Sequence, residues 1–490
     1  MAASKKTKHK KHKSRWGIVL LGIVAVGDAA GLTISSQTPP PDATQTEDTV
    51  AEEASPRDEP EERMNVLLIS VDTLRRDHLS LYGYERKTTP NLDRFFADGV
   101  VFNRATSSAP CTTPSVLQIL TGSYDYSFRR PRLAERLKNA GFQTAAFVSQ
   151  RHFRNNSGPL ESYARGFDTF DIQGAHETEP LHSILSARKA NRVSDGAIRW
   201  LAIHAKTKPF FMWLHYFDPH DPYDPPKDFQ QFPLPVKGLN GDRRTHLQEA
   251  MKRELATATP ERVREIRRMR NAHAHFGHIY SEKDIETLIG YYDGEILYTD
   301  YQIHRVLETL RRLGSLERTL VIFTADHGER LGEENRWAHC QSLHAYELDV
   351  PLMLSKRGSL PSRVSSAVST LDVVPTVLDM LDIKYDPSDV SGVNLYETET
   401  NRFVYSTWET DQCVQDRKWK LLSSSGGSNG TLSLFDISHG ADRQVDIDLT
   451  ATAPVESMKR ALSENQRRYS QVKSDLQTTV NQLKAIGYVQ

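Results

Sequence analysis

The chain has few cysteines: Cys111, Cys340 and Cys413 are the only three among 490 residues. Three is an odd number and too few for a disulfide framework, although one pair could still form a bridge in an exported protein. No two of them have the C-x-x-C spacing of a structural metal site. The sequence therefore excludes a disulfide-built scaffold and a cysteine-built metal site.

The chain also has almost no net charge. Its 62 Lys and Arg residues oppose 63 Asp and Glu residues, which leaves a formal net charge of -1. A near-neutral protein has no electrostatic field that gathers nucleic acid, so we expect no nucleic-acid partner. Hydrophobic residues make up 38% of the chain, which excludes a wholly disordered protein and suffices for a large core.

The N-terminal residues 1–63 differ in composition from the rest of the chain. Residues 1–15 carry seven Lys or Arg and no acid, and residues 16–34 are apolar apart from Asp28. Such a segment is a signal peptide or a single membrane anchor, and its basic flank stays in the cytoplasm. Residues 35–63 are acidic and rich in Pro and Thr, which predicts a disordered linker. We therefore expect a membrane-anchored protein whose main domain lies outside the cytoplasm, periplasmic or extracellular, or a secreted protein.

Beyond residue 63 the sequence alternates between apolar runs and helical patterns. The run 65–71 ends at Asp72 and predicts a buried parallel strand with a carboxylate at its tip. Comparable runs occupy 144–148, 210–214 and 319–324, with shorter candidates at 351–354 and 403–406; helical stretches lie at 90–98, 132–140, 194–205 and 287–313. This alternation predicts an α/β fold, with a mixed, mostly parallel sheet sandwiched by helices.

Polar side chains follow three of these predicted strands. Asp72 follows the first strand, His215 follows the run 210–214, and Asp326 with His327 follows the run 319–324. Ligands of open α/β sheets bind at the carboxyl ends of the strands, where these groups meet. Carboxylates with an imidazole indicate a divalent metal: manganese, zinc or calcium. Taken singly, each aspartate is equally typical of a helix cap.

A hydroxyl-rich segment precedes another predicted helix. Pro114 suits the first turn of that helix, with Thr112 or Thr113 near its N-cap. A hydroxyl at this place faces free backbone N–H groups, and a neighbouring metal would lower its pKa and make it a nucleophile. The alternative is an ordinary threonine cap.

Several motifs together carry a family resemblance. In order along about 64–490, the chain resembles the sulfatase family of the alkaline phosphatase superfamily at 72–79, 82–83, 89–93, 120–122, 210–223, 292–300, 324–329, 350–352, 419–422, 434–436 and 483–488. This resemblance implies an alkaline phosphatase-like core with a smaller C-terminal subdomain. It also implies hydrolysis of sulfate or phosphate esters, with a metal held by Asp72, Thr112, Asp326 and His327.

The chain departs from the family at the nucleophile. Sulfatases carry C-x-P-S-R, whose Cys is oxidised to formylglycine; here Thr112 occupies that position, Cys111 lies one residue early, and Val116 replaces the Arg. We therefore do not expect formylglycine. A threonine there is similar to the superfamily's phosphoethanolamine transferases and lipoteichoic acid synthases. A transferase acting on lipids or glycans, and a non-catalytic binding protein, remain alternatives.

Further histidines are candidates for substrate contact. His339 follows His327 by twelve residues, where the family has an anion-contacting histidine, and His215 and His220 have the spacing of the substrate loop of the transferase branches. The resemblance thus implies catalytic roles for His215 and His339, and substrate binding by His220 and Asp218. The alternative for each histidine is a loop residue bonded to the backbone.

The domain organisation follows from these patterns. We expect a catalytic domain over 64–400, with a basic helical insertion at 237–283, and a C-terminal subdomain over 401–490 that ends in a packing helix. The insertion is a lid, a patch for anionic lipid or a solvated face. The substrate is an ester of a small molecule, a glycan or a lipid head group, and the membrane is contacted through the N-terminal segment.

Overall fold

The computed structural model describes most of the chain from residue 63 onward. The described residues are 63–125, 130–150, 153, 163–172, 187–232, 259, 281–356, 358, 361–399, 401–424, 431–440, 442–445 and 453–470. They all belong to the second of two compact units, Met1–Glu59 and Pro60–Gln490. The predicted N-terminal flank, apolar segment and nearly all of the linker lie outside the described residues, as does most of the insertion 237–283. Within the described part, no helix is long and apolar enough to span a membrane.

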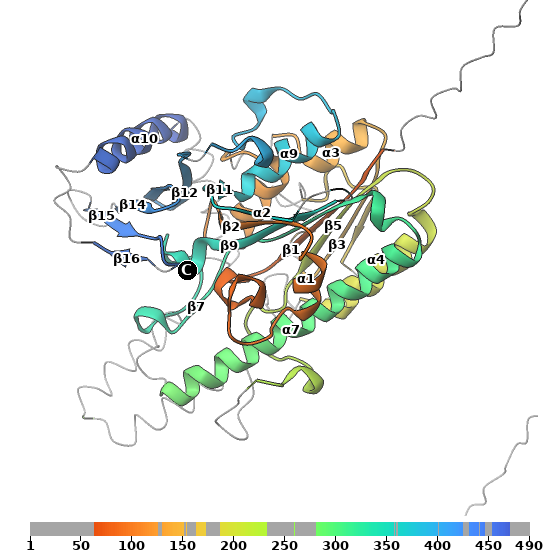
Figure 1. Ribbon diagram of the computed structural model, residues 1–490, viewed down its shortest axis with the longest axis horizontal. Helices are drawn as coiled ribbons and strands as arrows, with labels where there is room; N and C mark the ends of the chain where they lie inside the picture. The colour runs from red at the N-terminus through yellow and green to blue at the C-terminus, as the bar shows by residue number, and fades with distance from the viewer. Residues whose placement is uncertain are drawn as a thin grey trace, which may run out of the picture. The chain divides into compact units, whose positions relative to one another are not determined.

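A nine-stranded sheet forms the centre of the described structure (Figure 1). Its strand order is β10-β2-β9-β6-β1-β5-β3-β4, and β11 pairs with β2. The strands are β1 Asn65–Val71, β2 Val100–Thr106, β3 Gln143–Val148, β4 Thr169–Asp171, β5 Phe210–Tyr216, β6 Thr319–Ala325, β9 Asp349–Ser355, β10 Ser362–Val364 and β11 Val368–Ser369. All pairs are parallel except β2 with β9 and β6 with β9. The predicted mixed, mostly parallel sheet is therefore confirmed.

The predicted strands are found, with two differences. Every residue of β1, β5 and β6 is buried, as expected for strands covered on both faces. However, β5 continues to Tyr216, so that His215 lies within the strand and pairs with Ser70. The second difference is that the sequence analysis did not predict β2 or the short strands β4, β10 and β11.

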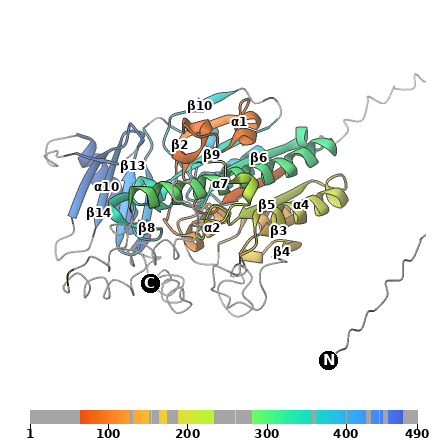
Figure 2. The same ribbon diagram turned by 90° about the horizontal axis from the view of Figure 1, so that it is seen from below.

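Helices cover both faces of the sheet. On one face lie α4 Ala190–His204 and α7 Glu282–Arg312, which contact each other (Figure 2). On the other lie α2 Thr112–Thr121, α3 Leu133–Asn139 and α9 Val373–Met380 (Figure 1). The remaining helices of the core are α1 Pro90–Phe95 and α8 Ala345–Leu348. Short 3-10 helices are η1 Arg76–His78, η2 Ser80–Tyr82, η6 Lys227–Phe229, η8 Leu316–Arg318, η9 Glu333–Asn335, η10 Thr370–Asp372, η11 Pro387–Asp389 and η12 Leu395–Glu397.

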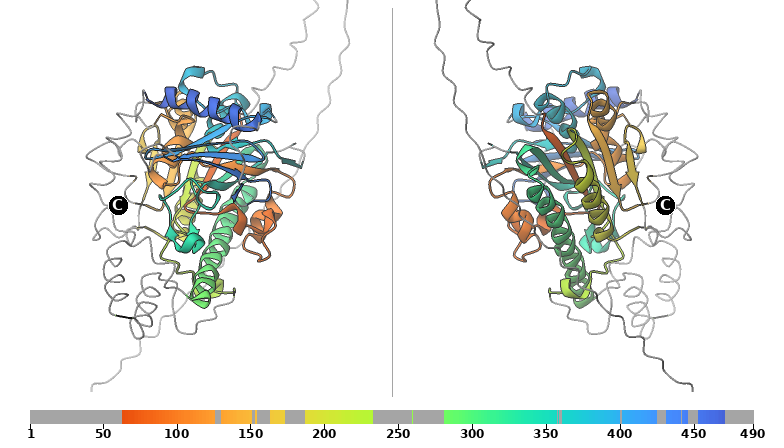
Figure 3. Two further views of the ribbon diagram at one scale, coloured as in Figure 1. Left: turned by 90° about the vertical axis from the view of Figure 1, so that its left-hand side faces the viewer. Right: turned by 90° about the vertical axis from the view of Figure 1, so that its right-hand side faces the viewer.

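A smaller antiparallel sheet follows the core. Its strands are β12 Val404–Trp408, β13 Asp411–Gln415, β14 Trp419–Ser424, β15 Thr431–Asp436 and β16 Arg443–Gln444, and helix α10 Ala453–Ser470 lies along it (Figure 3, left). Val455, Met458 and Leu462 of the helix are buried in one apolar cluster with residues of this sheet. The predicted packing helix is thus confirmed as far as residue 470. Its predicted continuation to 486 lies outside the described residues.

Candidate active site

Two neighbouring strands bring three of the predicted residues to one edge of the sheet. β1 and β6 are parallel and paired up to Val71 and Ala325, so Asp72 and Asp326 emerge side by side. His327 follows directly, and all three side chains are fully buried. Because parallel strands end at the same edge, this part of the site follows from the strand pattern.

Helix α2 presents a hydroxyl to this cluster. Thr112 is the first residue of α2, and its Oγ1 lies 3.1 Å from His327 Nε2 and 3.4 Å from Asp72 Oδ1. The prediction that Thr112 lies near the N-cap is confirmed: Cys111 is the N-cap residue and Thr112 follows it directly. Every residue of α2 is buried, so the hydroxyl is held on a rigid element.

His327 presents an unprotonated nitrogen to the carboxylates. Its Nδ1 lies 2.8 Å from the carbonyl oxygen of Gly328 and therefore carries the proton, which leaves a lone pair on Nε2. That nitrogen lies 3.6 Å from Asp72 Oδ1 and 3.6 Å from Asp326 Oδ2. Burial, reinforced by His339, lowers the pKa of His327 well below its usual value, so the ring is neutral. Three acceptor atoms thus face one another.

The pKa values of the two carboxylates, Asp72 and Asp326, are also shifted by burial. Burial, together with the nearby Asp326 and Glu329, raises the pKa of Asp72 well above its usual value. Burial also raises the pKa of Asp326 to about 8. Asp326 Oδ1 accepts bonds from the backbone N–H groups of Thr73 and His327, whereas Oδ2 accepts no hydrogen bond among the described residues. Buried acceptors without donors fit a divalent cation, which supplies the missing positive charge.

His215 joins these ligand candidates. The structure places one ligand atom each of Asp72, His215 and Asp326 within 4.8 Å of one another. The Nδ1 atom of His215 lies 2.8 Å from Ser70 Oγ on the neighbouring strand, which orients the ring. The sequence analysis predicted a catalytic contact to substrate for His215; its position inside β5 instead groups it with the two carboxylates.

Gln150 is a site residue that the sequence analysis missed. Its Nε2 donates to Asp72 Oδ2 at 2.5 Å, and its side chain is buried. Gln150 lies two residues beyond β3, at the same edge as the other groups. The strand-end pattern that revealed Asp72 was therefore also the signal for Gln150, but only acidic and histidine side chains were considered.

Two more predicted histidines line the same cluster. The His339 ring lies 4.6 Å from the His327 ring and 4.9 Å from the His220 ring. His339 Nδ1 lies 3.3 Å from Glu329 Oε1, so a buried carboxylate orients it. His220 Nδ1 lies 2.6 Å from the carbonyl oxygen of Asp221, which assigns the proton to Nδ1. Burial, with a contribution from His339, lowers the pKa of His220 to about 4. At neutral pH His220 Nε2 is therefore a hydrogen-bond acceptor, and its predicted substrate-binding role stays a prediction.

Asp218 has a structural environment. Its Oδ2 accepts from the backbone N–H of Ala190 at 2.8 Å, and its Oδ1 lies 3.2 Å from Lys189 Nζ. These contacts tie the segment after β5 to the start of α4. The predicted substrate-binding role of Asp218 stays a prediction; the structure places its carboxylate beside a helix start and a lysine.

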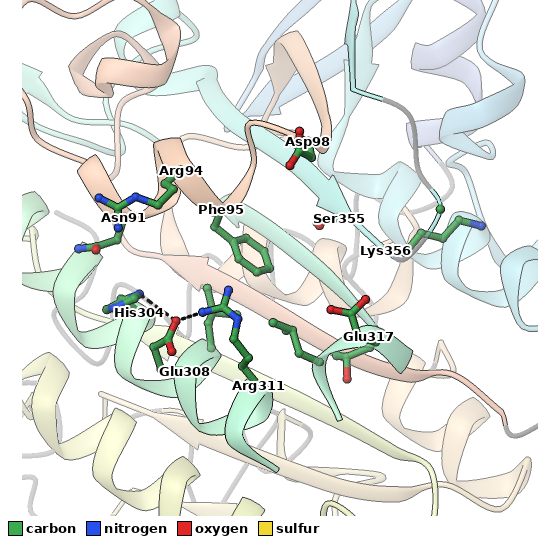
Figure 4. A pocket seen from close by; sticks show the side chains of 14 residues that line it. Asn91, Arg94, Phe95, Asp98, His304, Glu308, Arg311, Glu317, Ser355 and Lys356 are labelled. Carbon is green, nitrogen blue, oxygen red and sulfur yellow. Dashed lines mark hydrogen bonds and ion pairs between the residues drawn. The ribbon is translucent and has the colours of Figure 1, made fainter. Parts of the chain in front are cut away.

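A separate pocket lies at the opposite end of the sheet (Figure 4). It has a volume of about 390 Å³, and its lining includes Thr319 at the start of β6 and Ser355 at the end of antiparallel β9. None of the clustered residues lines it. Its charged side chains balance, with three cations and three carboxylates: Arg94, Arg311, Lys356, Asp98, Glu308 and Glu317. We therefore assign no function to this pocket.

Comparison with known proteins agrees with this arrangement. The family model described as Sulfatase matches residues 64–383, well over half of the chain. The chain belongs to the sulfatase family. An arylsulfatase from Clostridium perfringens is 26% identical over 406 residues, which cover 70% of this chain and 79% of that relative.

Solved structures share the sulfatase fold. A structure in complex with its substrate D-glucosamine-2-N,6-O-disulfate aligns with a TM-score of 0.63 at 19% identity, covering 84% of this chain and 99% of that chain. A phosphonate monoester hydrolase from Silicibacter pomeroyi aligns with a TM-score of 0.59 at 19% identity, covering 84% of this chain and 96% of that chain. The alkaline phosphatase-like fold inferred from the motifs is thereby confirmed.

One feature of this sulfatase-family site involves its cysteines. Cys111, directly before Thr112, forms a disulfide with Cys340, directly after His339. Cys413 is a buried free thiol. The open question of which pair could form a bridge is thus answered by the tertiary structure.

Proposed function

We propose that this sulfatase-family chain is a metal-dependent hydrolase of sulfate or phosphate esters with Thr112 as its nucleophile. One observation carries the proposal: the Thr112 hydroxyl lies 3.1 Å from an unprotonated imidazole nitrogen and 3.4 Å from a buried carboxylate. A mere helix cap would not need two further acceptors in a fully buried site. The proposed catalytic domain spans 64–400, and the C-terminal subdomain spans 401–490.

The residues suited to hold the metal are Asp72, Asp326, His327 and His215, with the Thr112 oxygen beside them. A bound dication would neutralise charge on the ester oxygens and lower the pKa of the threonine hydroxyl. Manganese, zinc and calcium remain the candidates, because the set mixes carboxylates with imidazoles. Gln150 holds Asp72 in place through its amide N–H.

The chain's own groups then perform the displacement. Thr112 Oγ1 gives its proton to a water molecule and forms a bond to sulfur or phosphorus, while the bond from that atom to the alcohol oxygen breaks. The departing alcohol oxygen takes a proton from His339, whose ring is oriented by Glu329. Water then attacks the threonine ester and gives a proton to His339, which the first step left unprotonated. The bond from sulfur or phosphorus to Thr112 Oγ1 breaks, Oγ1 regains a proton from water, and sulfate or phosphate is released. His220 Nε2 is available to accept a bond from the attacking water.

The relatives support both ester classes. The similarity to an arylsulfatase and to a sulfated-glucosamine complex favours sulfate esters, and the phosphonate monoester hydrolase favours phosphorus chemistry. We infer a substrate that is an ester of a small molecule, a glycan or a lipid head group. A threonine hydroxyl can attack sulfur or phosphorus, so the nucleophile by itself does not decide between sulfate and phosphate esters.

The disulfide supports two further parts of the proposal. Disulfides persist in oxidising compartments, which favours a catalytic domain outside the cytoplasm and agrees with the predicted anchor at 16–34. A Cys111 sulfur bonded to Cys340 is also not free for oxidation to formylglycine. Mass spectrometry of the non-reduced peptide that contains Cys111 tests both statements, because each requires the peptide to be linked to the Cys340 peptide.

The nucleophile is tested with two substitutions at position 112. Val has the shape of Thr without the hydroxyl, so we expect Thr112→Val to lower kcat at least about 10³-fold, whereas Thr112→Ser retains measurable turnover. Wild type and variants are assayed on aryl sulfates, aryl phosphates and phosphodiesters with manganese, zinc or calcium. Chelation by EDTA should abolish turnover, and adding metal should restore it.

Mass spectrometry of acid-quenched enzyme provides the second readout. A sulfuryl or phosphoryl adduct should appear on the wild-type peptide that contains Thr112 and be missing in Thr112→Val. Full activity of Thr112→Val, or a wild type inactive on all these esters with every metal, contradicts the proposed function.

A further inference from the structure

The Cys111–Cys340 disulfide joins the two chain segments that carry Thr112 and His339. Cys111 immediately precedes Thr112 and Cys340 immediately follows His339, although 229 positions separate the two cysteines. A second link runs beside it, because the backbone N–H of Cys340 donates to the carbonyl oxygen of Pro110 at 2.9 Å. Both links therefore act at the points where the two functional side chains leave the backbone.

The two segments differ in how much support they have otherwise. Thr112 belongs to α2, a ten-residue helix that is buried throughout. His339 follows β8 Trp337–Ala338, which forms a two-stranded sheet with β7 Arg330–Leu331 in the described part of the chain. His339 itself belongs to neither a helix nor a strand. The position of His339 thus depends on contacts of its loop more than the position of Thr112 does.

The backbone on either side of His339 is in an uncommon conformation. Ala338 has φ 80° and Cys340 has φ 62°, the left-handed region that residues other than glycine seldom adopt. Such residues persist where the surrounding structure determines them. Downstream, Glu347 accepts from the Gln341 N–H and from the Ser342 hydroxyl, at 3.0 and 2.8 Å. The disulfide adds a covalent constraint directly next to His339.

The disulfide lies in an apolar cluster, with Cys111 as its more buried end. Cys111 is fully buried, and the cluster contains Leu343, Leu348, Trp408 and the Cys413 thiol. Burial raises the pKa of Cys413 to about 11, so this third cysteine stays a neutral thiol. Cys413 therefore shares the environment of the disulfide without taking part in it.

We propose that the Cys111–Cys340 disulfide is a positioning element that sets His339 against Thr112, an inference that rests on the proposed function. Without the cross-link, α2 still holds Thr112 and the strand ends still hold Asp72, Asp326 and His327. The His339 loop loses its covalent constraint, so the proton donor for the leaving group moves away. Turnover should fall while metal binding persists.

The disulfide is first tested without any substrate. Denatured, non-reduced wild type should contain one thiol that reacts with Ellman's reagent, and three after reduction. Three reactive thiols before reduction would overturn the inference. This result does not depend on whether any ester is hydrolysed.

The positioning role is tested by removing the link at its less buried end. We expect Cys340→Ala to lower kcat at least tenfold, with affinity for Mn²⁺ in calorimetry within twofold of wild type. Cys413→Ala is the matched control, because it removes a buried sulfur from the same cluster and should leave kcat within twofold. A folded Cys340→Ala variant with kcat within twofold of wild type would overturn the inference.

A double-mutant cycle separates positioning from general stability. His339→Gln should lower activity much less in the Cys340→Ala protein than in wild type, because His339 is already displaced from its position beside Thr112 in that protein. Equal losses in both backgrounds would overturn the inference. If Cys340→Ala does not fold, wild type reduced by a phosphine while metal is bound replaces it in each comparison.

The positioning role can still be tested if the protein hydrolyses none of these esters. Binding of vanadate, a tetrahedral oxyanion, is then measured by calorimetry on wild type and Cys340→Ala. At least tenfold weaker binding in the variant supports the positioning role even though the proposed hydrolysis fails. Equal vanadate affinity overturns it.

Discussion

At the scale of single residues, the site is an arrangement of acceptors. His327 Nε2 lies 3.6 Å from Asp72 Oδ1 and 3.6 Å from Asp326 Oδ2, and this imidazole is neutral. Burial makes this arrangement costly in free energy unless a positive charge lies beside the carboxylates. The same burial keeps the Thr112 hydroxyl out of bulk solvent.

His220 gives a prediction of pH dependence. Its pKa is about 4 in the folded protein, against an ordinary value of 6.5. Between these values the unfolded chain binds a proton that the folded chain does not, so stability falls as the pH is lowered from 6.5 to 4. This one group contributes a loss of up to about 1.4 kcal/mol per pH unit.

Urea unfolding at pH 7 and pH 5 measures this contribution. The loss between the two pH values should be smaller in His220→Gln than in wild type, since glutamine does not titrate. An identical loss in wild type and His220→Gln would contradict the assignment of a buried neutral His220.

At the scale of elements, strand ends and turns place the ligands. His327 is followed by Gly328, whose N–H donates to the Glu347 carbonyl at 2.9 Å. A Cβ atom at Gly328 would overlap the carbonyl oxygen of Tyr346, which is backbone and cannot swing aside. Glycine thus permits the close approach of α8 to the chain just after β6.

A pair of substitutions distinguishes this local packing from general helix stability. Gly328→Ala should lower the melting temperature and weaken Mn²⁺ binding, because His327 has to move with its neighbour. Ser281→Ala removes the capping box that starts α7, where Asp284 N–H donates to Ser281 Oγ, at a cost of about 1 kcal/mol. It should lower the melting temperature alone. Equal Mn²⁺ affinity in Gly328→Ala and wild type, measured by calorimetry, would show that the turn does not position His327.

At the scale of the whole molecule, the small C-terminal sheet reaches the core through a buried charge. Asp442 accepts bonds from the Ala345 N–H and from Lys420 Nζ, both at 3.0 Å, and it contacts His344. Although burial opposes ionisation, Lys420 and His344 hold the pKa of Asp442 well below its usual value. This carboxylate therefore stays charged and joins strand β14 to α8.

Asp442→Asn tests the strength of this junction. The substitution leaves the buried ammonium of Lys420 without its counter-charge, so we expect destabilisation of about 3–5 kcal/mol. Differential scanning calorimetry measures the change, and Asp436→Asn on the same sheet, a partly buried carboxylate that contacts Ser438, serves as control. A melting temperature within experimental error of wild type in Asp442→Asn would show that the pair does not hold the subdomain.

The apolar runs of the sequence determined the sheet and the edge at which Asp72, Asp326 and His327 meet. A short apolar run is typical of a strand that is buried on both faces of a sheet, and parallel strands end at the same edge of that sheet. The motif order likewise predicted the family, which the matched residues 64–383 confirm. Strand β2 escaped prediction because Asn103 and Arg104 interrupt its apolar run.

Other parts of the site depend on segments that are distant in sequence. The pairing of Cys111 with Cys340, the approach of Gln150 to Asp72, and the engagement of Asp218 by Lys189 are contacts across many residues. No local pattern encodes such contacts, because they arise only when packing of the whole core brings the segments together. The protonation of His220 and His327 is decided in the same way, since burial and neighbouring charges set it.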